Sequence, residues 1–231
     1  MERFNIAIDG YSSCGKSTLA KALANKLGFR YIDTGAMYRA ATLYYMRKGL
    51  VHKGKKIDKE TLLAHLDEII VSFTYNPEKK VSETLLNGEN VEKEIRMMEV
   101  SENVSHVSVF KEIREKMVAL QQLMGKEKGV VMEGRDIGTV VFPDAELKIF
   151  MTADVSVRVQ RRLDELHSKG EHVTEEEVKA NLLMRDHEDT HRKENPLRQA
   201  KDALVLDNSE LSPQQQLDYV LRLIGDKFVV A

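Results

Sequence analysis

The fold is decided by the stretch Gly10-Tyr11-Ser12-Ser13-Cys14-Gly15-Lys16-Ser17-Thr18. Residues 3–8, just before it, form a short apolar run that favours a strand. The leucines after it recur at helical spacing, at Leu19, Leu23 and Leu27. A strand, a glycine loop and a helix around the pattern G-x-x-x-x-G-K-S indicate a phosphate-binding P-loop.

Each part of this loop offers positive charge or hydrogen-bond donors to an anion. The glycines let the backbone curl with its N–H groups inward, and the N-terminus of the helix adds a partial positive charge. Lys16 adds a full charge, and the hydroxyl of Ser17 can bind a Mg²⁺ that bridges nucleotide phosphates. The motif therefore predicts the class of ligand but does not define the reaction.

Length and charge narrow the class of protein further. The 231 residues suffice for one large core with inserted lobes. A formal net charge of −2 gives no basic field for a nucleic acid polymer or an anionic membrane, and no apolar stretch is long enough to cross a bilayer. The charged start Met1-Glu2-Arg3 predicts no signal peptide, and the single Cys14 fits a reducing compartment. We expect a monomeric cytoplasmic protein with small-molecule partners.

Strand-like and helix-like patterns alternate along most of the chain. Strands are predicted at residues 3–8, 29–32, 130–132, 147–150 and 203–206. Helices are predicted after the P-loop, over residues 35–48, and from Ser212-Pro213 onward. This alternation predicts an α/β fold with a mostly parallel central sheet and helices on both faces. Ligands in such folds lie beyond the carboxyl ends of the strands.

Two segments interrupt the alternation. Residues 69–75 and 81–86, with a turn at Asn76-Pro77 and Asn87-Gly88 after them, predict a small antiparallel unit outside the main sheet. Residues 157–192 have a helical pattern and are crowded with charge.

Arginines gather where the chain leaves a predicted strand or enters a charged helix. They occur within residues 33–39, within residues 133–139, at Arg158, Arg161 and Arg162, and within residues 185–192. An enzyme that joins two anionic phosphates needs fixed cations, and the arginine fork binds phosphate oxygens in pairs. A solvated helix face with salt bridges explains any one of these arginines alone. Together with a P-loop, they indicate phosphoryl transfer.

These motifs together resemble those of bacterial cytidylate kinases. Besides the P-loop, the matching stretches are D-T-G-A-M-Y-R at 33–39, L-L-N-G-E-N-V-x-x-E-I-R at 85–96, E-G-R-D-I-G-T-V-V-F-P-D-A at 133–145 and R-D-x-x-D-x-x-R at 185–192. The resemblance runs from Ile6 to about Ser212. It implies a P-loop nucleoside-monophosphate kinase that transfers the γ-phosphoryl group of Mg·ATP to CMP and dCMP, in pyrimidine nucleotide metabolism.

The same resemblance implies roles for individual residues. Residues 10–18 would hold ATP, with Lys16 on its β/γ phosphates and Ser17 on the Mg²⁺. The residues implied to bind the phosphate of CMP are Arg39, Arg135 and Arg185. Those implied to bind its cytosine and ribose are Thr34, Ser105, Arg114, Asp136, Asp189 and Arg192. The implied catalytic residues are Lys16, Arg135, Arg185 and three lid arginines, Arg158, Arg161 and Arg162.

The resemblance also divides one kinase domain, 1–231, into functional parts. The implied parts are a core of about 1–35, 97–157 and 193–231, a nucleoside-monophosphate-binding insertion of about 36–96 that contains the antiparallel unit, and a helical lid of about 158–192.

The chain departs from the family pattern at two places. Residues 11–14 stand where many relatives have proline and further glycines. Glu188 and Thr190 stand where some relatives carry arginine. We therefore expect the lid arginines at 158, 161 and 162 to carry more of the charge neutralisation.

Asp136 has a chemical reason to select cytosine. Its carboxylate can accept from the exocyclic amino group of cytosine, whereas uracil presents a carbonyl there. An unpaired buried acceptor costs about 1–3 kcal/mol, enough to discriminate CMP from UMP. No general base is required, because a phosphate monoester with a second pKa near 6 is largely dianionic at neutral pH. Alignment, charge neutralisation and exclusion of water then suffice.

Two alternatives come from other classes of protein. His187-Glu188-Asp189-Thr190-His191 matches H-E-x-x-H, so a zinc metallohydrolase could use both histidines as ligands and Glu188 as base, with His167 or His172 as a third ligand. The stretch lacks the apolar face that buries a zinc helix, and this alternative leaves the P-loop unexplained. A non-catalytic nucleotide switch would bind nucleotide without producing ADP.

Overall fold

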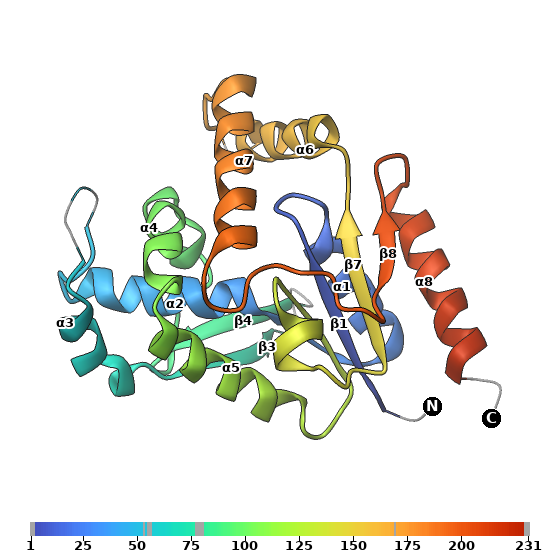
Figure 1. Cartoon of the computed structure of the whole chain (residues 1–231), viewed down its shortest axis with the longest axis horizontal. Helices are drawn as coiled ribbons and strands as arrows, with labels where there is room; N and C mark the ends of the chain where they lie inside the picture. The colour runs from blue at the N-terminus through green and yellow to red at the C-terminus, as the bar shows by residue number, and fades with distance from the viewer. Residues whose placement is uncertain (1–2, 53, 55–56, 77–80, 169, 229–231) are drawn as a thin grey trace. The chain divides into compact units, whose positions relative to one another are not determined.

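The computed structural model describes residues 3–52, 54, 57–76, 81–168 and 170–228 (Figure 1). The chain forms two compact units, one of Met1–Tyr31 with Met124–Ala231 and the other of Ile32–Leu123. The two units are defined by how the chain packs and not by the roles of its residues. The division into core, insertion and lid is a functional one and stays a prediction.

A parallel sheet forms the centre of the first unit. Its strands have the order β2-β6-β1-β7-β8. β1 pairs in parallel with β6 and with β7, and β7 pairs in parallel with β8. The strands are β1 (Asn5–Gly10), β2 (Arg30–Asp33), β6 (Val130–Gly134), β7 (Leu147–Thr152) and β8 (Leu204–Asp207). The predicted sheet is confirmed, with each strand within two residues of its predicted bounds.

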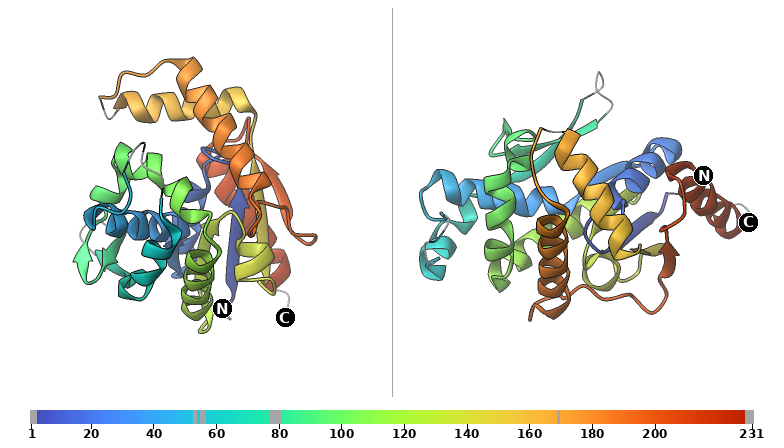
Figure 2. Two further views of the ribbon diagram at one scale, coloured as in Figure 1. Left: turned by 60° about the vertical axis from the view of Figure 1, so that its left-hand side comes forward. Right: turned by 90° about the horizontal axis from the view of Figure 1, so that it is seen from above.

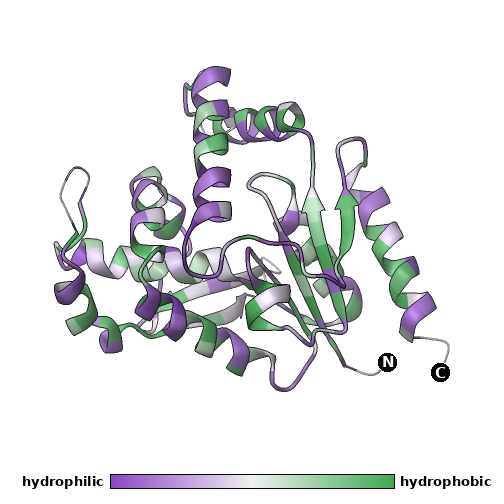
Figure 3. Ribbon diagram, in the orientation of Figure 1, coloured by the Kyte–Doolittle hydropathy of each residue, from purple (hydrophilic) through white to green (hydrophobic). Residues whose placement is uncertain are grey.

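Apolar packing fixes the helices of this unit. α1 (Lys16–Leu27) contacts β1, β6 and α8 (Pro213–Phe228). One shared apolar core contains Ile6, Ile8, Leu19, Leu23, Val131, Ile149, Val220 and Ile224. Figure 3 shows β7 and β8 as largely hydrophobic ribbons.

Among the described residues, no helix is both long and apolar enough to cross a membrane.

β1 is buried along its whole length, as a central strand covered on both faces should be. Its apolar pattern stops at Ile8, yet the strand continues through Asp9 to Gly10. The buried carboxylate of Asp9 accepts hydrogen bonds from the backbone N–H groups of Ile137 and Gly138. The hydropathy pattern therefore predicts a strand end at Ile8, two residues before the observed end at Gly10.

The charged stretch at 157–192, predicted as helical, forms two helices. These are α6 (Val155–Ser168) and α7 (Glu175–His191), which lie against each other in Figure 2. A capping box begins α7: Glu177 N–H donates to Thr174 Oγ1 at 3.2 Å, and Thr174 N–H donates to Glu177 Oε2 at 2.8 Å. The two helices pack through Val159, Leu166, Val178 and Leu182.

The second unit combines helices with an antiparallel sheet of order β3-β4-β5, which confirms the predicted antiparallel unit. Asn87 and Gly88 both have positive φ, 50° and 85°, as a tight turn between β4 and β5 requires. Pro77 of the predicted first turn lies outside the described residues. The elements are α2 (Thr34–Arg47), α3 (Lys59–Ala64), η1 (Leu66–Glu68), β3 (Val71–Asn76), β4 (Val81–Leu86), β5 (Glu89–Asn90), η2 (Glu94–Arg96), α4 (Met98–Ser108) and α5 (Lys111–Gly125).

Gly10 gives a direct test of the packing at the start of the P-loop. Its φ is +148°, and a Cβ there would overlap the carbonyl oxygen of Met151 on the neighbouring strand. We expect Gly10→Ala to lower the free energy of unfolding by about 2–4 kcal/mol, measured by chemical denaturation. The matched control is Gly225→Ala in α8, where a Cβ meets open space. That variant should stabilise by about 0.5–1 kcal/mol. Equal effects of both variants would contradict the close approach.

Candidate active site

The glycine loop leaves the carboxyl end of β1 and enters α1. Ser13 has a φ of 59° and Gly15 a φ of 87°, so two loop residues adopt left-handed conformations. The backbone N–H groups of Thr18 and Leu19 donate to the carbonyl of Gly15, which starts the helix. Glycine takes this left-handed conformation without strain, whereas Ser13 adopts it at a cost of about 1–2 kcal/mol. The loop therefore turns with a serine, and not a glycine, in the left-handed region at residue 13.

Lys16 is folded back onto this loop and is buried. Its Nζ donates to the carbonyl oxygens of Gly10, at 2.9 Å, and Tyr11, at 2.6 Å. Burial lowers the pKa of Lys16, and the charge of Arg135 lowers it further. A third contact joins Nζ to Cys14 Sγ at 3.9 Å. The two close acceptors are neutral carbonyls, so the charge of the ammonium remains available to an anion.

Arg158 is buried, only 5% exposed, and is held against the loop. Its Nη1 donates to Asp186 Oδ2 at 2.5 Å and to the carbonyl of Ser12 at 3.2 Å. Its Nε donates to the carbonyl of Ala153 at 3.1 Å. The other carboxylate oxygen of Asp186 accepts from the N–H of Ser12 at 3.3 Å. Asp186 on α7 therefore joins a backbone donor of the P-loop to an arginine of α6.

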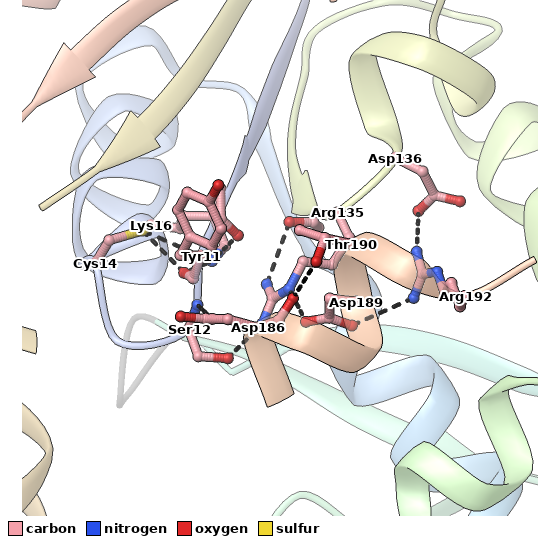
Figure 4. Close-up of polar contacts among 12 residues, drawn as sticks. Tyr11, Ser12, Cys14, Lys16, Arg135, Asp136, Asp186, Asp189, Thr190 and Arg192 are labelled. Atoms are coloured by element: carbon pink, nitrogen blue, oxygen red, sulfur yellow. Dashed lines mark hydrogen bonds and ion pairs between the residues drawn. The ribbon is translucent and has the colours of Figure 1, made fainter. Parts of the chain in front are cut away.

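A second group of ion pairs connects the residues just after β6 with the end of α7 (Figure 4). Arg135 donates through Nε to Asp189 Oδ2 at 2.6 Å and through Nη2 to Ser12 Oγ at 2.9 Å. Arg192 lies 3.4 Å from Asp189 Oδ1 and 3.8 Å from Asp136 Oδ1. Burial alone would raise the pKa of Asp189, but Arg135, Arg192 and Arg185 outweigh it and lower that pKa. Ion pairs thus connect four predicted site residues, Arg135, Asp136, Asp189 and Arg192, and Arg135 joins them to the P-loop.

The remaining lid arginines differ from Arg158 in their surroundings. Arg161 donates to the side-chain oxygen of Asn208 at 3.0 Å and to its backbone carbonyl at 2.9 Å. Asn208 Nδ2 in turn donates to the carbonyl of Cys14 at 2.6 Å. Arg162 pairs with Glu165 at 2.7 Å on the surface of α6. The structure therefore ties Arg158 and Arg161 to the loop region and leaves Arg162 in a surface ion pair.

Two predicted site residues of the second unit, Thr34 and Arg39, lie in the first half of α2. Asp33 accepts from the N–H of Ala36 at 3.0 Å and pairs with Arg39 at 3.0 Å and Arg96 at 2.9 Å. Burial alone would raise the pKa of Asp33, but Arg39 and Arg96 outweigh it and lower that pKa to about 2. Thr34, the first residue of α2, is buried. Arg39 is thus oriented by a carboxylate at the helix N-terminus.

Arg114 and Ser105 also belong to the second unit. Arg114 is 2% exposed, and its Cζ lies 5.1 Å from the centre of the Tyr38 ring. Its Nη1 donates to the carbonyl of Ser108 at 3.3 Å. Ser105 is half-buried on α4, and its carbonyl accepts from Ser108 Oγ. A guanidinium buried this deeply and stacked on a ring is held in one orientation.

Four polar residues near these groups were not among the predicted site residues. They are Asp9, Arg96, Asp186 and Asn208. Arg96 had a signal, since it closes the motif at 85–96. Asp186 lies inside the motif R-D-x-x-D-x-x-R at 185–192, next to the predicted site residue Arg185. For Asp9 and Asn208, nothing in the local sequence pattern indicates that they contact the loop or its neighbours.

The donor set near the P-loop suits Mg²⁺ and not zinc. Within the described parts of the chain, no three His, Cys, Asp or Glu residues converge as a metal site. His187 and His191 stack with ring centres 4.0 Å apart, and His191 Nδ1 is occupied by Thr190 and the carbonyl of His187. Ser17, in the first turn of α1, offers a hydroxyl, and Mg²⁺ with a nucleotide needs few protein ligands because phosphates and water complete its shell. The zinc alternative has no support.

A parallel sheet with a glycine loop after its central strand, and arginines held beside that loop, are typical of P-loop kinases. A family model described as cytidylate kinase matches residues 6–226. The chain is 54% identical over 225 residues to the cytidylate kinase of Bacteroides thetaiotaomicron, covering 97% of this chain and 98% of that one. It is 56% identical over 217 residues to that of Porphyromonas gingivalis, covering 94% of each. The chain belongs to the cytidylate kinase family.

A solved structure resembles the whole chain. It is an uncharacterized protein from Eubacterium ventriosum, 13% identical, with a TM-score of 0.51 over 97% of this chain and 99% of that one. At this identity the likeness concerns the fold alone.

Asp186 is expected to contribute strongly to stability. Asp186→Ala leaves Arg158 buried without its carboxylate, and we expect the free energy of unfolding to fall by about 3 kcal/mol in a denaturant titration. Arg162→Ala is the control, because it removes the surface pair with Glu165 and should cost less than about 1 kcal/mol. A change of similar size in both variants would mean that Arg158 is not held by Asp186.

Proposed function

We propose that this protein transfers the γ-phosphoryl group of ATP to CMP, and also to dCMP, to give ADP and the nucleoside diphosphate. The observation that carries the proposal is the joining of Arg135, Asp189 and Arg192 to the P-loop through Ser12, in a chain of the cytidylate kinase family. Such an arrangement places cations next to the loop at which a nucleoside triphosphate would bind.

Residues 10–18 would bind the phosphates of ATP through backbone N–H groups. Lys16 would leave the carbonyls of Gly10 and Tyr11 for the β/γ phosphates, because charged acceptors bind an ammonium more strongly than neutral ones. Ser17 would bind the Mg²⁺ that accompanies ATP. That ion neutralises part of the charge on the transferred group.

CMP would be bound by the arginines and polar residues that the family resemblance implies. Arg39, Arg135 and Arg185 would bind its phosphate, and Asp189 with Arg192 would bind the ribose. Ser105, Arg114 and Asp136 would bind the cytosine, with Thr34 close by. Carboxylates already orient Arg39, Arg135 and Arg192, so less side-chain entropy is lost when the nucleotide binds.

Phosphoryl transfer would then depend on alignment and on exclusion of water. No proton acceptor is needed, because the attacking phosphate oxygen is already deprotonated near neutral pH. We propose that residues 158–192 act as the lid and residues 36–96 as the nucleoside-monophosphate-binding insertion. Arg158, Arg161 and Arg162 would neutralise the transferred group, since Glu188 and Thr190 supply no cation. We also propose a monomeric cytoplasmic enzyme of pyrimidine nucleotide metabolism.

The reaction is tested by ADP release with CMP, dCMP, UMP, AMP and GMP as acceptors. We expect rapid release with CMP and dCMP and at least about tenfold lower kcat/KM with UMP. Lys16→Ala should abolish turnover while far-UV circular dichroism stays unchanged. Nucleotide binding without any acceptor-dependent ADP release would instead favour a non-catalytic switch.

Asp136 is expected to determine the choice of base. Asp136→Ala should raise KM for CMP by about tenfold or more while KM for ATP changes less than about twofold, because only cytosine loses its acceptor. Asp218→Ala is the control, because it removes an exposed carboxylate on α8 that has no proposed role in binding. Equal losses for CMP and ATP would remove Asp136 from base recognition.

A further inference from the structure

Asp9 is a buried carboxylate with no part in the roles described so far. It is the second-last residue of β1 and is only 4% exposed. Its Oδ1 accepts from the N–H of Ile137 at 2.8 Å, and its Oδ2 accepts from the N–H of Gly138 at 2.7 Å. Both oxygens are therefore used by consecutive backbone donors of one distant turn.

That turn directly follows Asp136. Ile137 begins η3 (Ile137–Val141), a single turn of π-helix, an uncommon structure that often occurs at functional sites. The carbonyl of Asp136 accepts from the N–H groups of Val140, at 2.9 Å, and Val141, at 3.2 Å. Asp9 accepts from the first two N–H groups of this turn, and the carbonyl of Asp136 accepts from two later ones. Hydrogen bonds therefore fix the backbone that follows Asp136 at both ends of the turn.

The fit between Asp9 and this turn leaves no spare room. A Cβ on Gly138 would lie 3.3 Å from Asp9 Oδ2 and 3.3 Å from Cδ of Lys148. A methyl group there would push the carboxylate or the lysine side chain by a few tenths of an ångström. Glycine at residue 138 therefore suits the close approach of the carboxylate to the two N–H groups.

An acidic group at this place is unfavourable unless it has a specific use. Burial raises the pKa of Asp9 to about 6, and the charge of Asp136 contributes in the same direction. The two backbone N–H groups and Lys16 lower it. An apolar residue, as at Ile6 and Ile8 of the same strand, would avoid this desolvation. The carboxylate is explained by the two backbone donors that it orients.

We propose that Asp9 is a positioning residue for base recognition: by fixing the backbone at 137–138, it sets the direction in which Asp136 presents its carboxylate to the base of the acceptor nucleotide. The inference rests on the proposed function, in which Asp136 reads cytosine. Asp9 also lies one residue before the P-loop, so the same strand end supports the donor loop and the acceptor-reading residue.

Asp9→Asn is the decisive variant, because it keeps the shape of the side chain but turns one acceptor into a donor that faces a backbone N–H. We expect KM for CMP to rise about tenfold and the ratio of kcat/KM for CMP over UMP to fall about tenfold. KM for ATP should stay within about twofold. A merely structural role would lower the melting temperature without changing this ratio.

Two further variants keep the test interpretable. Ile8→Val, at the adjacent buried position of β1, should lower the melting temperature and leave the CMP-to-UMP ratio unchanged. Gly138→Ala should reproduce the loss of discrimination from the other side of the contact, and it serves as the test if Asp9→Asn fails to fold. Adding Asp9→Asn to Asp136→Ala should cause no further loss of discrimination, because both act through the same carboxylate.

Failure of this inference can be told apart from failure of the proposed function. If Asp136→Ala loses the preference for CMP while Asp9→Asn and Gly138→Ala keep it, Asp9 does not position Asp136, and the proposed function stands. If the unmodified protein shows no preference for CMP over UMP, the proposed base recognition and this inference are both overturned.

Discussion

Positive charge removed from water is the constraint that organises the first unit. Lys16, Arg135 and Arg158 all lie beside the glycine loop at low exposure, where an unpaired cation would be strongly unfavourable. Each is held by oxygen acceptors: loop carbonyls for Lys16, Asp189 for Arg135, and Asp186 for Arg158. Helix α7 supplies both carboxylates. The acidic residues of this helix thus make a concentrated set of cations compatible with a folded chain.

The same pairing would keep the proposed phosphate-binding groups in place before a ligand arrives. Ser12 shows this most clearly, since its N–H donates to Asp186 and its hydroxyl accepts from Arg135. Carboxylate oxygens and phosphate oxygens are similar acceptors for such donors. A nucleotide that binds here would replace contacts of the same kind, so the loop need not reorganise extensively.

Local patterns in the sequence were enough to predict the sheet, the P-loop and the antiparallel unit. Strand periodicity, the helical leucines after Ser17 and the Asn87-Gly88 turn each act over a few residues. The capping box of Thr174 and Glu177 is a local signal for the start of α7. It is hard to recognise in the sequence because charged residues crowd the whole stretch. The recognised family motifs supplied the candidate arginines.

The contacts around the loop could not be predicted in this way. Asp9 meets Gly138 across 129 residues of sequence, Asp186 meets Ser12 across 174, and Asn208 meets Cys14 across 194. A single aspartate or asparagine carries no mark of such a partner, because its role depends on which strand ends become neighbours. Three-dimensional pairing, and not composition or periodicity, determines the contacts of these residues.

The most direct test of the account is the pKa of the Lys16 ammonium, followed by NMR of the lysine side chain in the free protein and in the protein saturated with ADP. The account predicts a pKa below the ordinary lysine range in the free protein, because the group is buried beside Arg135. It predicts a rise when nucleotide phosphates become its partners. An ordinary pKa in the free protein, or one that nucleotide leaves unchanged, would contradict it.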